Sequence, residues 1–181
     1  MNEMPSDQEN KDHFDATANN KGLWVMRAND LHVASRVLRE RVVSIHIDSL
    51  DDVEYAGLGS TTAMLQGFAI EVLLKAYWLT QGNRLGDDGM YSVPTLKRDV
   101  HKLDLIADAV GYEDISPVER EVLVRLSLFV SSYGRYPVTM RWQQTPLRPD
   151  ASGVPHRISW SNDDHTIAEA LIQRLKRDTE K

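Results

Sequence analysis

Apolar residues recur along the chain with the period of an α-helix in five segments. The most apolar segment is 67–79, and we expect the helix around it, from about residue 60 to 81, to be the centre of a bundle. The other helical patterns cover 23–46, 100–110, 116–134 and the residues after 161. The pattern predicts an all-α, up-and-down bundle of about five helices, with room for a small β-hairpin between the last two helices.

Polar cap residues set the limits of the last two helices. Residues 116–119 (Ser-Pro-Val-Glu) form a capping-box sequence with proline at the first helical position, and Ser161 is expected to cap the final helix. The first residues, 1–20, are polar and acidic, which indicates a disordered or loosely ordered tail. We therefore divide the chain into this tail and a single helical domain at 21–181.

Glycines divide the region around the central helix. Gly57 and Gly59 end an acidic stretch, so we expect a connector at 48–59 and a helix cap at 60–62. Gly67 lies inside the helical pattern, where glycine costs roughly 1 kcal/mol relative to alanine. This cost predicts that another backbone approaches the helix closely at Gly67. The expected hairpin would pair 138–142 with 157–160.

Composition narrows the class of protein. The 181 residues are 41% hydrophobic and 27% charged, as is usual for one globular domain. Cysteine is absent, which suits a reducing cytoplasm and excludes disulfides and thiolate metal sites. The net charge of −6 argues against a protein that coats nucleic acid. No uninterrupted apolar run reaches the roughly 18 residues of a membrane span, so we expect no membrane partner.

Two charged residues interrupt the most apolar helix. Glu71 and Lys75 are four residues apart, with the glutamate first, so an ion pair can form along one helix face. Neither charge would be buried without a partner, because an isolated buried charge is very costly. A structural pair is favoured over a general acid–base couple, which would need a cleft beside it.

Six histidines are present, and none is three or four residues from another. A helical metal site of paired histidines is therefore not predicted, and we expect no metal and no cofactor. His101 opens a short helix, where a surface or capping role is favoured.

The segment 135–160 changes character, with prolines, arginines and tryptophans but no helical period. Arg135, Tyr136, Arg141 and Trp142 place guanidinium groups beside aromatic rings, a combination that binds phosphates and stacks on bases. Alternatively the rings close one end of the core while the arginine stems lie on apolar surface. Both interpretations stay open.

Three of these segments together resemble the HEPN superfamily (higher eukaryote and prokaryote nucleotide-binding domains). The segment 68–76 (Phe-Ala-Ile-Glu-Val-Leu-Leu-Lys-Ala) resembles the family's central helix, 101–105 (His-Lys-Leu-Asp-Leu) its H-x-L helix start, and 134–137 (Gly-Arg-Tyr-Pro) its RYP turn. They occur in family order. The resemblance implies a helical bundle that is often dimeric and prokaryotic, with relatives in toxin–antitoxin and defence systems.

Some relatives are metal-independent RNases that use an Arg and a His separated by a short spacer with a polar first residue. Arg41 and His46 have such a spacing, but Val42 occupies the polar position. On a continuous helix these two side chains would also point about 140° apart, so they would not converge. A standard RNase motif is therefore not predicted.

We accordingly expect a cytoplasmic, HEPN-like protein that binds RNA or a nucleotide and is not a competent RNase. The ligand-binding candidates are His101, Arg135, Tyr136, Arg141, Trp142, Glu71 and Lys75, with no catalytic residue assigned. A homodimer and a cognate protein partner are the expected assemblies. The alternatives are a metal-independent endoribonuclease, with His101 and Arg135 from different segments, and a non-catalytic interaction or dimerisation module.

Overall fold

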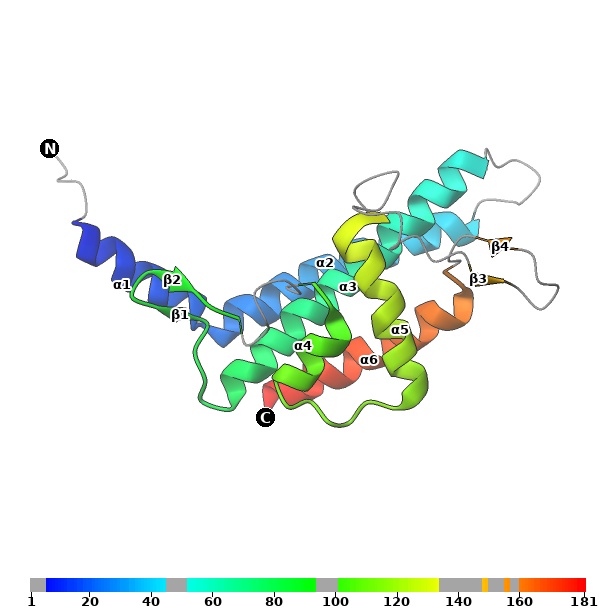
Figure 1. Ribbon diagram of the computed structural model, residues 1–181. Coiled ribbons are helices and arrows are strands. Elements are labelled where there is room, and N and C mark those ends of the chain that lie inside the picture. The colour runs from blue at the N-terminus through cyan, green and yellow to red at the C-terminus, as the bar shows by residue number, and fades with distance from the viewer. Residues whose placement is uncertain (1–5, 45–51, 94–100, 134–147, 150–154, 157–159) are drawn as a thin grey trace, which may run out of the picture.

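The computed structural model describes residues 6–44, 52–93, 101–133, 148–149, 155–156 and 160–181. Within these residues the chain forms six α-helices and two very short β-hairpins (Figure 1). The helices are α1 (Asp7–Ala18), α2 (Lys21–Ser44), α3 (Asp52–Thr80), α4 (Leu103–Ala109), α5 (Pro117–Leu128), which continues as a π-helical turn (Phe129–Tyr133), and α6 (Asn162–Glu180). The hairpins pair β1 (Gly86–Asp87) with β2 (Met90–Tyr91), and β3 (Arg148–Pro149) with β4 (Pro155–His156).

The prediction of an all-α bundle with a small hairpin between the last two helices is confirmed. That hairpin pairs β3 with β4. The expected strand at 138–142 lies outside the described residues, as does most of 157–160. The π-helical turn carries α5 on to residue 133, next to the predicted end at Gly134, which also lies outside the described residues.

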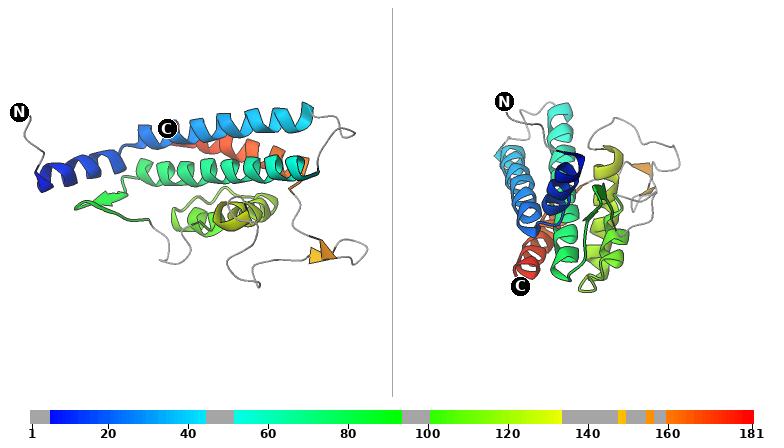
Figure 2. Two further views of the ribbon diagram at one scale, coloured as in Figure 1. Left: turned by 90° about the horizontal axis from the view of Figure 1, so that it is seen from above. Right: turned by 90° about the vertical axis from the view of Figure 1, so that its left-hand side faces the viewer.

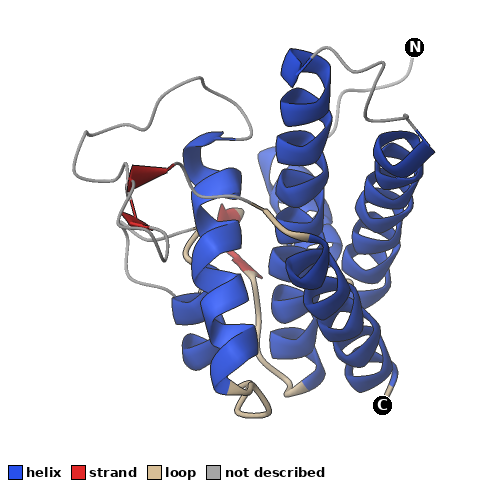
Figure 3. Cartoon of the chain, turned by 90° about the vertical axis from the view of Figure 1, so that its right-hand side faces the viewer, coloured by secondary structure: helices blue, strands red, loops and turns tan. Residues whose placement is uncertain are grey.

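Helix α3 is the centre of the bundle, as its apolar pattern predicts. It packs against α2, α4, α5 and α6, and lies between α2 and α6 on one side and α4 and α5 on the other (Figures 2 and 3). Its fully buried side chains join those of the surrounding helices in one core, which includes Ala69, Ile70, Leu73, Leu74, Leu103, Ile106, Leu123, Leu126, Leu171, Ile172 and Leu175.

The start of α3 corrects the sequence prediction. The helix begins at Asp52, so Gly57 and Gly59 lie within it and the expected connector and cap at 60–62 are wrong. The hydroxyls of Thr61 and Thr62 instead donate back to the carbonyls four residues earlier, at 2.9 and 2.8 Å. Two glycines weaken a helix by about 1 kcal/mol each. In a helix of 29 residues packed on several neighbours this cost does not end it.

The N-terminal segment also differs from the expected tail. Ser6 caps α1 through a capping box with Glu9, in which each side chain binds the other's backbone N–H. The sequence Ser-Asp-Gln-Glu at 6–9 carries this signal, but the weak apolar periodicity that follows concealed it. Helix α1 projects beyond the bundle together with the β1–β2 hairpin (Figure 1).

The other helix limits agree with the sequence. Capping boxes join Ser116 to Glu119 at the start of α5 and Ser161 to Asp164 at the start of α6. Helix α3 ends before Gly82, which has a φ of +79°. A glycine accepts this conformation without strain, so it stops the helix.

Gly67 marks the closest approach to α3. A Cβ atom on this residue would lie 2.4 Å from Cγ2 of Val130 and 3.6 Å from the carbonyl oxygen of Leu126. The prediction of a close approach is confirmed, although a valine side chain, and not a backbone, makes the nearest contact.

By length and composition the segment Gly57–Thr80 of α3 is apolar enough to cross a membrane. The segment contains two charged residues, Glu71 and Lys75, so it is apolar on average without being an uninterrupted apolar run. Half of the most apolar 18-residue stretch of this segment is buried inside the protein. The core helix of a bundle has the same apolar composition. The packing of α3 against four other helices therefore explains why this segment is so apolar.

Candidate functional site

The charged pair of α3 is buried in the core helix. Nζ of Lys75 lies 2.5 Å from Oε1 of Glu71, and only 4% of Glu71 and 8% of Lys75 are exposed. Ile70 and Leu74, which precede the two charged residues in sequence, are almost completely buried. A single charge in these surroundings would be strongly destabilising, so each residue requires the other.

His101 brings a third ionisable group to the pair. Its Nδ1 atom lies 2.9 Å from Oε2 of Glu71, so one carboxylate binds both Lys75 and His101 through its two oxygens. The residue precedes α4, whose first backbone N–H, that of Leu103, donates to Oγ of Ser127 at 2.8 Å. This contact fixes the start of α4, and His101 with it, against α3.

The hydrogen bond sets the tautomer of His101. An ionised carboxylate only accepts, so Nδ1 carries the proton and Nε2 of the neutral ring is unprotonated. The side chain of His101 is 33% exposed, and no described residue hydrogen-bonds to Nε2. The ring is nearly perpendicular to that of Phe68, with the two ring centroids 6.2 Å apart. A buried carboxylate that orients an imidazole with an accessible nitrogen is a suitable arrangement for a general base.

The charges reinforce one another. Burial disfavours the ionised form of Glu71, but the hydrogen bond from His101 and the charge of Lys75 outweigh it and lower the pKa of the carboxyl group. Burial likewise disfavours the ammonium of Lys75, yet the Glu71 charge outweighs it and raises the pKa of Lys75. Both groups are therefore ionised at neutral pH.

Two aromatic rings cover the ammonium group of Lys75. Nζ lies 5.9 Å from the centre of the Trp24 ring and 5.7 Å from that of Tyr91, within the range of a cation–π interaction. The two rings are stacked, with centroids 5.9 Å apart and planes 15° from parallel. Burial raises the pKa of the Tyr91 hydroxyl, although the Lys75 charge acts in the opposite direction. Helices α2 and α3 and strand β2 thus meet at one ammonium group.

The β1–β2 hairpin, which carries Tyr91, is attached to the end of α1. The side chain of Asn19 donates to the carbonyl of Gly86 at 2.8 Å and accepts from the N–H groups of Leu85 and Gly86 at 2.8 and 3.2 Å. A Cβ atom on Gly86 would lie 2.7 Å from that of Ala18, so the hairpin lies directly on α1. Helix α1 and the hairpin are therefore one structural unit that holds Tyr91 in place.

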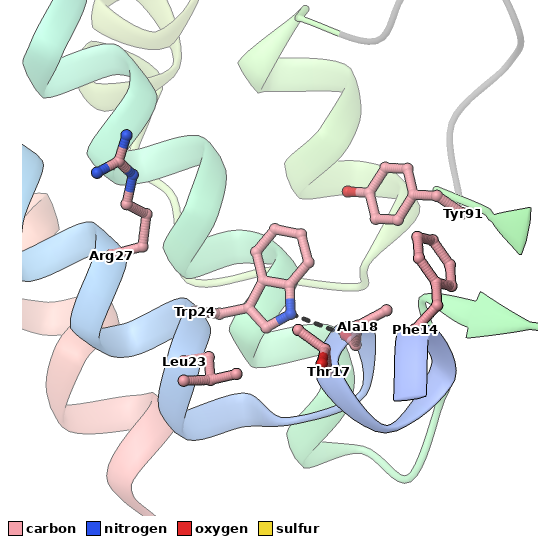
Figure 4. Close-up of a pocket in the computed structure, with 7 residues that line it drawn as sticks. All are labelled: Phe14, Thr17, Ala18, Leu23, Trp24, Arg27 and Tyr91. Carbon is pink, nitrogen blue, oxygen red and sulfur yellow. Dashed lines mark hydrogen bonds between the residues drawn. The ribbon is translucent and has the colours of Figure 1, made fainter. Parts of the chain in front are cut away.

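A pocket of about 350 Å³ opens between α1, α2 and this hairpin (Figure 4). We call it the aromatic pocket, and it is lined by Phe14, Thr17, Ala18, Leu23, Trp24, Arg27 and Tyr91. The indole N–H of Trp24 donates to the carbonyl of Ala18 at 2.8 Å, which fixes the plane of the ring. Trp24 and Tyr91 both line the pocket and cover Lys75, so the pocket adjoins the charged cluster.

Two further histidines attach α6 to the rest of the bundle. His32 of α2 lies 2.6 Å from Glu169 through Nε2 and 2.9 Å from Nζ of Lys176 through Nδ1. Nδ1 of His165 lies 2.8 Å from Oε1 of Gln66 in α3 and 2.9 Å from the indole nitrogen of Trp160, and burial lowers the pKa of its ring to about 4. Both rings are more than 90% buried, which indicates a structural role.

Of the seven predicted site residues, the structure brings three together: Glu71, Lys75 and His101. The other four, Arg135, Tyr136, Arg141 and Trp142, lie outside the described residues. Among the residues that are described, no three acidic, histidine or cysteine side chains are placed to hold a metal ion.

Sequence reasoning missed the two aromatic residues of the cluster. Trp24 fits the apolar period of the helix predicted at 23–46, which is typical of a core residue, and Tyr91 lies in a long loop without periodicity. Their stacking joins residues from two elements that are 67 positions apart, and no local pattern carries such a signal. No family model, curated protein or solved structure matches the chain.

Proposed function

We propose that the chain is a HEPN-type helical bundle that binds RNA or a nucleotide and lacks the standard RNase pair. The observation that carries this proposal is the hydrogen bond of 2.9 Å between His101 and Glu71. Glu71 belongs to the first of the three sequence segments that resemble the family, and His101 opens the second. Two segments that are 30 residues apart in sequence thus meet at one carboxylate. The third segment, 134–137, lies outside the described residues.

The geometry gives these residues different roles. The side chains of Glu71 and Lys75 are 5% and 10% exposed, and each is already engaged by partners, so they position the site. His101 has an accessible ring nitrogen that can accept a hydrogen bond, and it is the contact we propose for a ribose hydroxyl. Arg135 would bind phosphate, and Tyr136, Arg141 and Trp142 would contribute stacking and charge.

An endoribonuclease is the second candidate, and the tautomer of His101 favours it. With Nδ1–H bound to Glu71, the unprotonated Nε2 can accept the proton of a ribose 2′-hydroxyl. The 2′-oxygen would then attack the adjacent phosphorus, and the bond from phosphorus to the 5′-oxygen would break. The leaving oxygen takes a proton from solvent or an acid, and Arg135 would stabilise the charged phosphorane. Arg41 of the motif-like pair is exposed on α2, while His46 lies outside the described residues.

An RNA-binding assay tests the leading proposal. The purified chain is titrated with labelled single-stranded RNA in the absence of metal, at two salt concentrations. We expect binding that weakens steeply with salt, because phosphate contacts release counterions. His101→Ala and Arg135→Ala should both weaken it, whereas His13→Ala, an exposed histidine on α1, should bind as the wild type does. Equal binding by all four proteins would refute the proposed site.

The same samples separate the two candidates. Cleavage by the wild type that is lost in His101→Ala would establish the nuclease and displace the binding-only proposal. Binding without cleavage at high protein concentration would eliminate the nuclease. If neither RNA nor nucleotides bind to the wild type, both candidates fail and an interaction module remains.

We also propose that the chain forms a homodimer through the outer face of α2. Met26, Val33 and Val37 lie on this face, opposite the core, and are 56%, 57% and 59% exposed. Exposed aliphatic side chains in one row on a helix are typical of a contact surface. Asp30 lies on the same face, and Arg41 flanks it. In an antiparallel pair of α2 helices whose midpoint falls between residues 35 and 36, the Asp30 of each copy would lie level with the Arg41 of the other, so the charges are complementary.

A further inference from the structure

We propose that the aromatic pocket binds a small planar aromatic molecule that carries a negative charge. The pocket is distinct from the contacts proposed above for His101 and Arg135, and its lining includes neither residue.

The walls of the pocket favour a flat ring. Phe14 of α1, Trp24 of α2 and Tyr91 of β2 surround one space, as Figure 4 shows. Phe14 is 38% and Tyr91 45% exposed, although such rings gain free energy by burial. The volume of about 350 Å³ is at the lower end of the range of roughly 300–1,000 Å³ found for small-molecule pockets. One ring or two fused rings fit this space, whereas a helix does not.

The charge of the pocket favours an anion. Arg27 is the one charged residue among the seven that line it, and it is exposed. No described residue forms an ion pair or hydrogen bond with its guanidinium group. A guanidinium group binds carboxylates and phosphates through two parallel hydrogen bonds. In Figure 4 Arg27 lies on the other side of Trp24 from Phe14, so an acidic group would extend from the ring past the edge of Trp24.

The pocket is formed before any ligand arrives. The Trp24 ring is held by its hydrogen bond to Ala18 and by its stacking on Tyr91. The Tyr91 ring is held by the hairpin and by the ammonium of Lys75, 5.7 Å from its centre. A ligand therefore gains contact with rigid rings and does not have to order them, which favours affinity.

Calorimetric titration of the full chain with two pairs of probes tests the proposal. Each pair has a charged and an uncharged member: indole-3-carboxylate with indole, and adenosine monophosphate with adenosine. We expect at least one charged probe to bind, roughly tenfold or more tighter than its uncharged partner. The pair that binds identifies the source of the ligand as an aromatic acid or a nucleotide.

Substitutions of two exposed residues distinguish the contribution of the aromatic wall from that of the positive charge. Phe14→Ala removes one wall of the pocket and should weaken the binding of both members of the pair by about tenfold, which is the size of one stacking contact. Arg27→Ala should abolish the preference for the charged member while leaving the uncharged member unaffected. Val118→Ala on α5 and Arg177→Ala on α6 replace exposed residues outside the pocket, and these variants should bind as the wild type does. Circular dichroism of each variant verifies that the fold is retained.

Three outcomes would overturn the proposal. The first is that no probe binds to the wild type. The second is that Phe14→Ala and Arg27→Ala bind the charged probe as the wild type does. The third is that Phe14→Ala changes the mass of the protein in solution, in which case the pocket is a contact between copies of the chain.

Discussion

His101 and Glu71 are joined across 30 residues of sequence by a hydrogen bond of 2.9 Å, and the same carboxylate holds Lys75 at 2.5 Å. One buried residue therefore neutralises the charge inside α3 and orients the imidazole at the start of α4. Stability and the proposed binding site depend on the same carboxylate. A change at Glu71 should consequently affect both, in ways that separate variants can distinguish.

Replacement of Glu71 by alanine should strongly destabilise the fold. It leaves the ammonium of Lys75 buried and without its anionic partner, and broken pairs of this kind cost about 3–5 kcal/mol. Urea denaturation followed by circular dichroism would measure the loss in the free energy of unfolding.

Two variants control this experiment. Glu121→Ala removes an exposed carboxylate that lies 3.6 Å from Arg125, and should change the free energy of unfolding by less than about 1 kcal/mol. The double variant Glu71→Gln with Lys75→Met removes both charges and should recover much of the lost stability. A loss below about 1 kcal/mol for Glu71→Ala would show that the pair is not buried as the structure has it.

Alanine at Gly67 should have the opposite effect to alanine at Gly57, although both residues lie in α3. At Gly67 the new Cβ would meet Cγ2 of Val130 at 2.4 Å, and overpacking of this kind costs roughly 1–3 kcal/mol. At Gly57 the new Cβ would meet no atom of the described residues within 4 Å beyond its chain neighbours and its own helix backbone, so alanine should stabilise the helix by up to about 1 kcal/mol. Thermal denaturation measures both shifts. Equal effects at the two positions would contradict the close packing of α3 against α5.

The free energy of unfolding should fall as the pH is lowered from 6.5 toward 4, because of His165. Burial, with a smaller effect of the Arg39 charge, lowers the pKa of its ring from 6.5 to about 4, while Asp164 acts in the opposite direction. In this range the unfolded chain takes up a proton that the folded chain refuses, so stability decreases with falling pH. The slope from this group is at most about 1.4 kcal/mol per pH unit.

Urea denaturation at a series of pH values measures this dependence. His165→Gln should lose the part of the slope that His165 contributes, whereas His13→Gln, an exposed control, should retain it. An unchanged slope in His165→Gln would mean that the ring takes up its proton in the folded protein as readily as in the unfolded chain.

Local signals in the sequence specified most of the fold. The capping boxes at Ser116 and Ser161 set the starts of α5 and α6, because a cap depends on residues only three positions apart. The start of α3 was mispredicted because glycine lowers helix stability by about 1 kcal/mol, which packing in a 29-residue helix overrides. Helix propensity is a weak guide to where a helix begins when tertiary contacts contribute more free energy than the propensity does.

The candidate site was predictable only in part. Glu71 and Lys75 were identifiable because two charges in an apolar helix must have partners. The stacking of Trp24 on Tyr91 was not, since it depends on how the β1–β2 hairpin lies against α1 and α2. The aromatic pocket therefore emerges only when these elements are packed together.

A charge on the outer face of α2 should prevent self-association. Val33→Glu and Val37→Glu each place a carboxylate in the centre of the proposed contact, where burial without a partner is strongly unfavourable. Light scattering should give twice the chain mass for the wild type and the single-chain mass for both variants. Val124→Glu, at a valine of α5 that is 40% exposed, adds the same charge outside this face and should remain dimeric. A monomeric wild type, or a dimer that survives both substitutions, would exclude this face as the subunit contact.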